Sequence, residues 1–327
     1  MATIYDVAKR ARVSTYTVSS VLNRSAYVSP ELTSRVQKAV RELDYTINDL
    51  ARSLQTRKTR TVGMLIPDIA NPFYAKVVRG VEDVLKRSGY SLILGSTYND
   101  GAEQSRYLTV FRSKQVDGLL LFVAPGDSTD IRNMVRAKKP VVFVGRLPVG
   151  FSADSVTPDH AKGTRLAVEH LIAKGYRRIG LITGHLALTT GSDRVAGWRR
   201  ALKKAGLPAG PELVGEGDWT SESGYREAMR LLRSEPRPDA LFAANCLMMT
   251  GALQALKELG LACPAGVAVM SSDDSDWLDV FEPRISTVLQ PSYSMGEKAA
   301  ELLLKRVKSP GRKYEKIILE PELKIRD

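Results

Sequence analysis

The sequence predicts an α/β protein that consists of a small helical domain at the N-terminus and a larger core of two doubly wound parallel sheets. Three observations carry this prediction. Residues 1–59 show helical patterns and almost no strand signal, apolar runs of strand length alternate with amphipathic stretches from residue 61 onward, and about ten such runs fit two sheets better than one. With 327 residues, the chain is long enough for two or three domains with cores of their own.

The N-terminal segment contains signals for three short helices. The first is expected over residues 4–11, with Thr3 as its N-cap and Asp6 at the capping-box position. A second helix is expected after Ser14, and a third after Ser29, where a proline occupies the first helical position. The tight turn between the first two helices is typical of a helix-turn-helix module.

The rest of the chain alternates between strands and helices. Apolar runs of strand length occur at residues 62–66, 91–95, 118–123, 141–145, 179–183, 240–244, 267–271 and 316–319. Amphipathic stretches of helical length lie between most of them, for example at 72–88, 160–174, 193–205 and 221–233. Continuous apolar strands that alternate with helices indicate parallel sheets covered on both faces. Ligands of such folds bind beyond the carboxyl ends of the strands, so we expect a cleft where the two sheets face each other.

The charge distribution indicates an acidic partner for the N-terminal segment. The chain carries 48 Lys and Arg against 36 Asp and Glu, a formal charge of +12. Residues 1–59 hold ten of the basic and five of the acidic side chains, a net charge of +5. Charge per residue is therefore about three times denser here than in the rest of the chain, which favours contact with a polyanion such as nucleic acid.

Several classes of protein are not expected. The two cysteines, Cys246 and Cys263, have no metal-ligand spacing, and they suit a reducing cytoplasm better than a disulfide framework. No apolar run approaches the roughly 18 residues of a membrane span, and no signal peptide is evident, which argues against an exported binding protein. Without a glycine-rich phosphate loop, a nucleophile elbow or a metal cluster, we expect no enzyme, no catalytic residue, no metal and no cofactor.

The segment TIYDVAKRARVSTYTVSSVLN, residues 3–23, resembles the DNA-binding domain of the lactose-repressor (LacI/GalR) family. Further matches to the family follow in order along almost the whole chain. They are Tyr45, Asn48, residues 51–54, 71–74, 80–82, 116–118, 175–179, 194–197, 222–225 and 251–253, Pro283, and Gln290 with Pro291. The resemblance implies a cytoplasmic transcriptional regulator, most simply a repressor, that binds a double-stranded DNA operator as a homodimer and responds to a small-molecule effector.

The resemblance also implies a domain organisation. It places a helix-turn-helix domain at 1–45, a hinge segment at 46–59, and a periplasmic-binding-protein-like core at 60–327. The first core subdomain is expected at about 60–157 plus 288–316, and the second at about 158–287 plus 317–327.

Carried over by position, the family's DNA contacts lie at the start of the first helix, on the second helix or next to it, and in the hinge. These residues are Thr3, Ser14, Thr15, Tyr16, Thr17, Ser20, Asn23, Tyr27, Arg52, Leu54 and Gln55. Leu54 is expected to wedge between base steps in the minor groove, although packing on a neighbouring domain is the commoner fate of a linker leucine. Many family members carry an arginine where this chain has Ser20, and a turn glycine where it has Arg12. A left-handed Arg12 would cost up to about 1 kcal/mol.

The effector cleft implied by the resemblance combines aromatic and charged side chains. Its residues are Phe73, Tyr74, Thr190, Arg194, Trp219, Cys246 and Asp273. Aromatic rings stack on sugar or base faces, while Arg and Asp fix hydroxyls or amides. A salt bridge between Arg194 and Asp273 is nearly as plausible, as are packing roles for Phe73 and Trp219. Cys246 stands where relatives commonly have aspartate, and His160 is a further candidate. The alternative function is a small-molecule-binding protein of this core fold without operator-specific DNA binding.

Overall fold

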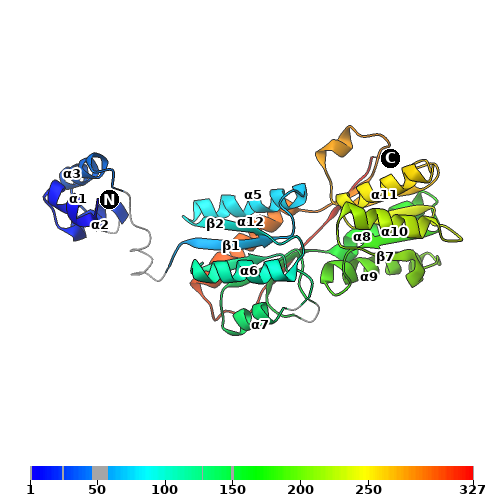
Figure 1. Cartoon of the computed structure of the whole chain (residues 1–327), viewed down its shortest axis with the longest axis horizontal. Helices are drawn as coiled ribbons and strands as arrows, with labels where there is room; N and C mark the ends of the chain where they lie inside the picture. Colours follow the sequence, from blue (N-terminus) through cyan, green and yellow to red (C-terminus); the bar gives the residue numbers. More distant parts are fainter. Residues whose placement is uncertain (1, 24–25, 46–57, 127, 149–150, 327) are drawn as a thin grey trace. The chain divides into compact units, whose positions relative to one another are not determined.

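The computed structural model describes residues 2–23, 26–45, 58–126, 128–148 and 151–326, and it divides the chain into two units, 1–59 and 60–327. The described residues of the first unit form three helices, α1 (Ile4–Ala11), α2 (Thr15–Asn23) and α3 (Pro30–Glu42) (Figure 1). All three begin where the capping signals predict. Most of the expected hinge segment lies outside the described residues.

The turn between α1 and α2 depends on its end residues. The Thr3 and Asp6 side chains form the predicted capping box at the start of α1. Arg12 ends that helix in the left-handed conformation, with φ 52° and ψ 51°, and its backbone N–H donates to the carbonyls of Ala8 and Lys9. The strain expected for a non-glycine residue here is therefore present. Arg35 of α3 donates to the carbonyls of Ala11 and Arg12, and so satisfies the open end of α1.

The first sheet of the second unit has six parallel strands in the order β11-β5-β4-β3-β1-β2. These are β1 (Thr61–Ile66), β2 (Ser91–Ser96), β3 (Gly118–Leu121), β4 (Val141–Val144), β5 (Asp154–Pro158) and β11 (Lys316–Leu319). Helices α5 (Pro72–Arg87) and α12 (Ser292–Lys308) cover one face, and α6 (Gly101–Ser113) and α7 (Thr129–Arg136) cover the other (Figure 1). A Cβ at Gly80 would lie 2.2 Å from the Tyr293 carbonyl oxygen, so this glycine lets α5 and α12 pack closely.

The second sheet also has six strands, in the order β12-β10-β9-β8-β6-β7, and within it β12 is antiparallel to β10. Its strands are β6 (Ile179–Thr183), β7 (Val214–Glu216), β8 (Ala240–Ala243), β9 (Ala268–Ser272), β10 (Thr287–Leu289) and β12 (Glu322–Lys324). Helices α8 (His160–Ala173) and α9 (Thr189–Lys204) lie on one side, and α10 (Ser221–Leu232) and α11 (Cys246–Glu258) on the other (Figure 1). Two short 3₁₀ turns, η1 (Pro211–Leu213) and η2 (Asp276–Asp279), complete the second subdomain.

The chain crosses between the two subdomains three times. The crossings follow β5, β10 and β11. The crossings therefore lie two or three residues after the boundaries expected at about 288 and 317, because β10 hydrogen-bonds to β9 in the second sheet and β11 pairs along its whole length with β5 in the first. Strand pairing joins residues that are distant in the sequence, so hydropathy did not reveal these two exchanges.

Other differences concern elements with weak local signals. Helix α9 begins at Thr189, four residues before the predicted start, because its first turn contains polar residues that break the apolar pattern. Strands β5, β7, β10 and β12 were not among the predicted runs, since they are short or polar. Across the part of the chain that the structure describes, no helix is both long and apolar enough to span a membrane.

Candidate functional site

Helix α2 carries the candidate DNA contacts of the first unit. The Ser14 hydroxyl accepts from the Thr17 backbone N–H at 3.1 Å, which fixes the start of the helix. Tyr16, in the first turn, is 73% exposed, and Tyr27 beyond the helix is 90% exposed. Both rings are therefore accessible to a partner. Thr15 and Thr17 are half-buried beside Tyr16.

The other candidates on this unit differ in availability. Thr3 is exposed, but its hydroxyl is engaged with Asp6 in the capping box. Asn23 is exposed and its amide donates to the Ser19 hydroxyl. Ser20 departs from the prediction, because its side chain is only 2% exposed and is packed inside the three-helix unit. A hydroxyl in that position is not presented to bases, and the expectation of a direct Ser20 contact is wrong for this arrangement.

Three predicted DNA contacts, Arg52, Leu54 and Gln55, lie outside the described residues. The minor-groove role of Leu54 therefore stays a prediction.

The second unit contains a cleft at the carboxyl ends of its two sheets. Six of the seven predicted effector residues line it, namely Phe73, Tyr74, Thr190, Arg194, Trp219 and Asp273. The parallel strands explain this convergence, because loops that follow β1, β6, β7 and β9 all emerge at the edges where the sheets face each other. The cavity is partly open and has a volume of about 40 Å³, which is room for a few water molecules.

Aromatic rings form one wall of the cleft. Phe73 and Tyr74 meet edge to face with centroids 5.2 Å apart, and Tyr74 meets Phe122 in the same way at 5.0 Å. Trp219 enters from the second subdomain with a φ of 70°, and the Asn245 amide donates to its carbonyl oxygen at 3.0 Å. A Cβ at Gly184 would lie 2.0 Å from the Trp219 indole, so a glycine is required beneath this ring. Backbone strain of this kind clusters at ligand sites.

Arg146 is a cleft residue that the sequence reasoning missed. It follows β4, is 2% exposed, and lies with its guanidinium 4.5 Å from the centre of the Trp219 ring. One terminal nitrogen donates to Asn99 Oδ1 at 2.6 Å, but Nε has no partner. Burial lowers the pKa of Arg146 to about 10, and nearby Arg194 acts in the same direction. The group remains cationic at neutral pH.

Arg194 and Asp273 lie in the second subdomain and do not form the direct ion pair that was the alternative prediction. The described residues join them through Ser272, whose hydroxyl accepts from Arg194 at 3.4 Å and from the Gln290 amide at 3.1 Å. Gln290 also donates to an Asp273 carboxylate oxygen. Burial raises the pKa of Asp273 to about 7, against the opposing effects of Arg194 and Gln290. Asp273 is therefore a carboxyl group that titrates near neutrality.

His160 joins the cleft from the start of α8. Its Nε2 lies 2.9 Å from the Gly145 carbonyl oxygen, which only accepts, so Nε2 carries the proton. Burial and the charge of Arg194 lower the pKa of His160 to about 3. The imidazole is thus neutral, and its Nδ1 remains an acceptor. Among the described residues, no group of three or more His, Cys, Asp or Glu side chains is arranged to bind a metal.

Cys246 does not line the cavity, which corrects the prediction for this residue. Its thiol donates to the Asp273 backbone carbonyl at 3.2 Å, so it lies behind the carboxylate and supports the loop. Burial raises the pKa of the Cys246 thiol to about 12, and the group stays protonated. Cys246 helps to hold the backbone at Asp273, whereas an aspartate at this position would have added a second carboxylate.

Further cleft residues were missed for a common reason. Asn71, Phe122, Asn245 and Gln290 also line the cavity. Each lies within a few residues of the carboxyl end of a strand, so the rule that ligands bind beyond these ends could have selected them. Their types alone gave no signal, since asparagine, glutamine and phenylalanine are common in loops and cores.

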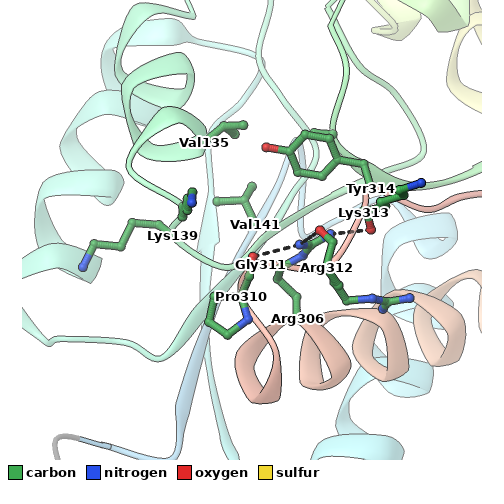
Figure 2. A pocket seen from close by; sticks show the side chains of 11 residues that line it. Val135, Lys139, Val141, Arg306, Pro310, Gly311, Arg312, Lys313 and Tyr314 are labelled. Atoms are coloured by element: carbon green, nitrogen blue, oxygen red, sulfur yellow. Dashed lines mark hydrogen bonds between the residues drawn. The ribbon is translucent and has the colours of Figure 1, made fainter.

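A second cavity, of about 240 Å³, lies near the amino end of β5 in the first subdomain. Figure 2 shows Arg306 of α12 at its centre, with hydrogen bonds to the backbone of the 310–313 turn. Arg306 also pairs with the buried Asp154 through Nε, at 2.6 Å, and through one terminal nitrogen, at 3.0 Å. Every nitrogen of this guanidinium has a partner, which is typical of a structural clamp.

Comparison with known proteins gives two family matches. Residues 3–48 match "Bacterial regulatory proteins, lacI family", and residues 168–327 match "Periplasmic binding protein-like domain". The chain is 39% identical to the ribose operon repressor of Escherichia coli, over 99% of this chain and 98% of the relative. It is 35% identical to the HTH-type transcriptional repressor PurR of Aliivibrio salmonicida, over 100% and 98%.

A solved structure is similar over the same length. It is the lac repressor dimer bound to operator and the anti-inducer ONPF, with a TM-score of 0.87 and 28% identity over 99% of this chain and 98% of that one. The fold, the family matches and the curated repressors agree, and the chain belongs to the LacI family of bacterial transcriptional regulators.

Proposed function

We propose that this protein is a repressor that binds an operator as a homodimer in the cytoplasm, and that a small polar ligand in the cleft between its core subdomains controls its affinity for DNA. It acts as a regulator and not as an enzyme. The names of its relatives support repression, and the dimer, the operator and the anti-inducer of the lac repressor structure support the remaining parts.

The observation that carries the ligand proposal is a concentration of unsatisfied polar atoms. Eight buried side-chain atoms in the described part of the chain lack a hydrogen-bond partner. Four of them belong to cleft residues, namely Arg146 Nε, Arg194 Nε, Thr190 Oγ1 and Gln290 Oε1. Buried polar groups are nearly always paired, so such a cluster is best explained by a ligand that completes it. These donors and acceptors come from both subdomains.

This division between subdomains supports a mechanism for control. A ligand that bonds to Arg146 on one side and to Arg194 on the other stabilises the closed arrangement over any open one. The crossings after β5, β10 and β11 are the connections that change when the subdomains move. Ligand binding thereby changes the affinity of the protein for its operator.

For DNA recognition, we propose that the first turn of α2 enters the major groove. Tyr16 is the exposed group at that turn, with Thr15 and Thr17 beside it. The ten basic side chains within residues 1–59 supply the phosphate contacts. Since small hydroxyls discriminate weakly between bases, part of the specificity rests on the shape of the operator.

The test begins with selection of operator sequences from a random duplex pool, followed by fluorescence anisotropy. Tyr16→Ala should weaken binding to the selected duplex roughly tenfold or more but leave binding to random duplex within about threefold. The matched control, Tyr98→Ala, removes a similarly exposed tyrosine of the second unit and should change neither affinity. Failure to select any preferred sequence would support the alternative, a small-molecule-binding protein without operator specificity.

Ligand control is tested by titrating candidate metabolites into the preformed complex. Asp273→Ala and Trp219→Ala should abolish the ligand response while operator affinity without ligand stays near that of the wild type. A normal response in both variants would show that the effector binds elsewhere.

A further inference from the structure

The proposed effector cleft carries more positive than negative charge. Its lining has two buried guanidinium groups, Arg146 and Arg194, but one carboxylate, Asp273. The other titratable side chains of the lining, His160 and Tyr74, are neutral, because burial lowers the pKa of the imidazole to about 3 and raises that of the phenol to about 12. The cleft therefore has a net charge of +1 when Asp273 is ionised, and of +2 when it is protonated.

The excess charge belongs to Arg146. Its neighbours are the neutral amide of Asn99 and the face of the Trp219 ring, and no described carboxylate forms an ion pair with it. Asp273 is engaged instead with Gln290 on the opposite side of the cleft. A guanidinium that is 2% exposed and has no anionic partner among the described residues is costly, because burial removes most of its hydration.

Arg306 is a buried arginine of the same subdomain with a structural role, and its bonding partners can be compared with those of Arg146. It is 4% exposed, and the carboxylate of Asp154 binds it through two nitrogens. Backbone carbonyls satisfy its remaining donors. Arg146 is buried to a similar degree and lines the cavity, but its Nε has no partner and no described carboxylate pairs with it. The difference indicates that the anion for Arg146 arrives with the ligand.

We propose that the effector is an anion, a hydroxylated sugar-like molecule with one carboxylate or phosphate group, and that Arg146 binds this oxyanion. The proposal rests on the function proposed above, and it specifies the class of ligand for that cleft. An oxyanion forms charge-assisted bonds with a guanidinium, whereas a neutral hydroxyl forms weaker ones. The rest of the ligand lies against Phe73 and Trp219, with its hydroxyls on Arg194 and Asp273.

The state of Asp273 agrees with this assignment. Burial raises the pKa of its carboxyl to about 7, so the group is partly protonated at neutral pH and repels an anionic ligand less than an ordinary aspartate would. A protonated Asp273 also donates a hydrogen bond, which suits a ligand hydroxyl or oxyanion.

The experiment uses matched ligands that differ in the oxyanion. Calorimetry and thermal unfolding of the full chain compare ribose with ribonate and ribose 5-phosphate, glucose with gluconate and glucose 6-phosphate, and galactose with galacturonate, and inorganic phosphate serves as a minimal probe. We expect at least one acidic member to bind tenfold or more tightly than its neutral counterpart. The carboxylate and phosphate arms identify which oxyanion is preferred.

Variants assign the preference to Arg146. Arg146→Gln should abolish the difference in affinity between the acidic ligand and its neutral counterpart, and Arg146→Lys should restore part of that difference. Arg112→Gln removes an exposed arginine of α6 and serves as the control that changes nothing. Ligand-free Arg146→Gln should unfold at or above the wild-type temperature, because no native ion pair is lost.

The outcomes separate this inference from the function on which it rests. If a neutral sugar binds as tightly as its acidic forms and releases or strengthens operator binding, the anionic class is wrong and ligand control stands. If no acidic compound and no phosphate stabilises the wild type more than Arg146→Gln, the oxyanion site is refuted. Failure of the repressor assignment would be seen separately, in the operator-selection assay.

Discussion

The first subdomain contains a buried arginine at each of its two ends, and the two differ in how completely their nitrogens are paired. At the amino end of β5, Arg306 has a carboxylate on two nitrogens and carbonyls on the rest. After the carboxyl end of β4, Arg146 has one neutral amide, an aromatic ring and an open Nε. The first arrangement contributes to the stability of the fold, and the second leaves bonding capacity for a ligand. The complete pairing of Arg306 thus suits a structural role, and the incomplete pairing of Arg146 suits the ligand-binding role proposed for it.

The largest expected effect on stability is at Arg306, the arginine whose nitrogens are all paired. Arg306→Met leaves the buried Asp154 carboxylate without its cationic partner, with the Glu315 backbone N–H as a remaining donor, so the free energy of unfolding should fall by about 3–5 kcal/mol. Urea denaturation measures this change. Lys298→Met, which breaks an exposed pair with Glu301, should cost less than about 1 kcal/mol. Similar losses for the two variants would show that the clamp is not a structural element.

The next largest effect is a pH dependence of stability that comes from Asp273 in the cleft. The pKa of Asp273 is about 7 in the folded state and near 3.8 when exposed, so the folded protein binds more protons between these values and loses stability as the pH rises from 4 to 7. Around this carboxyl, Arg194 stays charged, and His160, Tyr74 and Cys246 stay neutral over this range.

Asp273→Asn isolates this contribution. Relative to the wild type, the variant should gain a few kcal/mol of stability, about 4 at most, as the pH rises from 4 to 7. The unfolded-state titration of His160 has the opposite sign but is the same in both proteins, so it cancels in the difference. Denaturant titrations at several pH values measure this difference, and one that stays constant with pH would place Asp273 in a more hydrated site.

Substitution of two glycines, Gly184 under Trp219 and Gly311 beside Arg306, has a smaller effect on stability. A Cβ at Gly184 would overlap the Trp219 ring at 2.0 Å, whereas one at Gly311 in the turn beside Arg306 meets nothing within 4 Å. Gly184→Ala should therefore cost about 1–3 kcal/mol and reduce the ligand response, and Gly311→Ala should change stability by less than about 0.5 kcal/mol. Thermal unfolding and ligand titration test both. Equal behaviour would mean that Trp219 is free to move.

The smallest effect concerns Cys246. Because the thiol lies behind Asp273 and outside the cavity, Cys246→Ser should keep a donor to the Asp273 carbonyl and change stability by less than about 1 kcal/mol. Effector affinity should stay within about threefold. Calorimetry measures this, and a loss of tenfold or more would return Cys246 to the ligand contacts.

Much of the fold follows from the sequence read locally. The cap at Thr3 and the proline after Ser29 start α1 and α3 where they were expected. Strand and helix alternation located the two sheets, and the resemblance to the family selected Phe73, Tyr74, Arg194, Trp219 and Asp273 for the cleft that contains them. These signals can be recognised in the sequence because capping and hydropathy patterns depend on residues within a few positions of one another.

The tertiary structure alone decided which groups are paired. It paired β10 with the second sheet and β11 with the first, buried Ser20, directed the Cys246 thiol to the Asp273 backbone carbonyl, and brought Arg146 over Trp219 with no described carboxylate as its partner. Each of these outcomes depends on contacts between residues far apart in the chain. Local sequence determines which bonds a side chain can form, but burial and the choice of partner are set when distant segments pack together, and that packing left Arg146 Nε without a partner among the described residues.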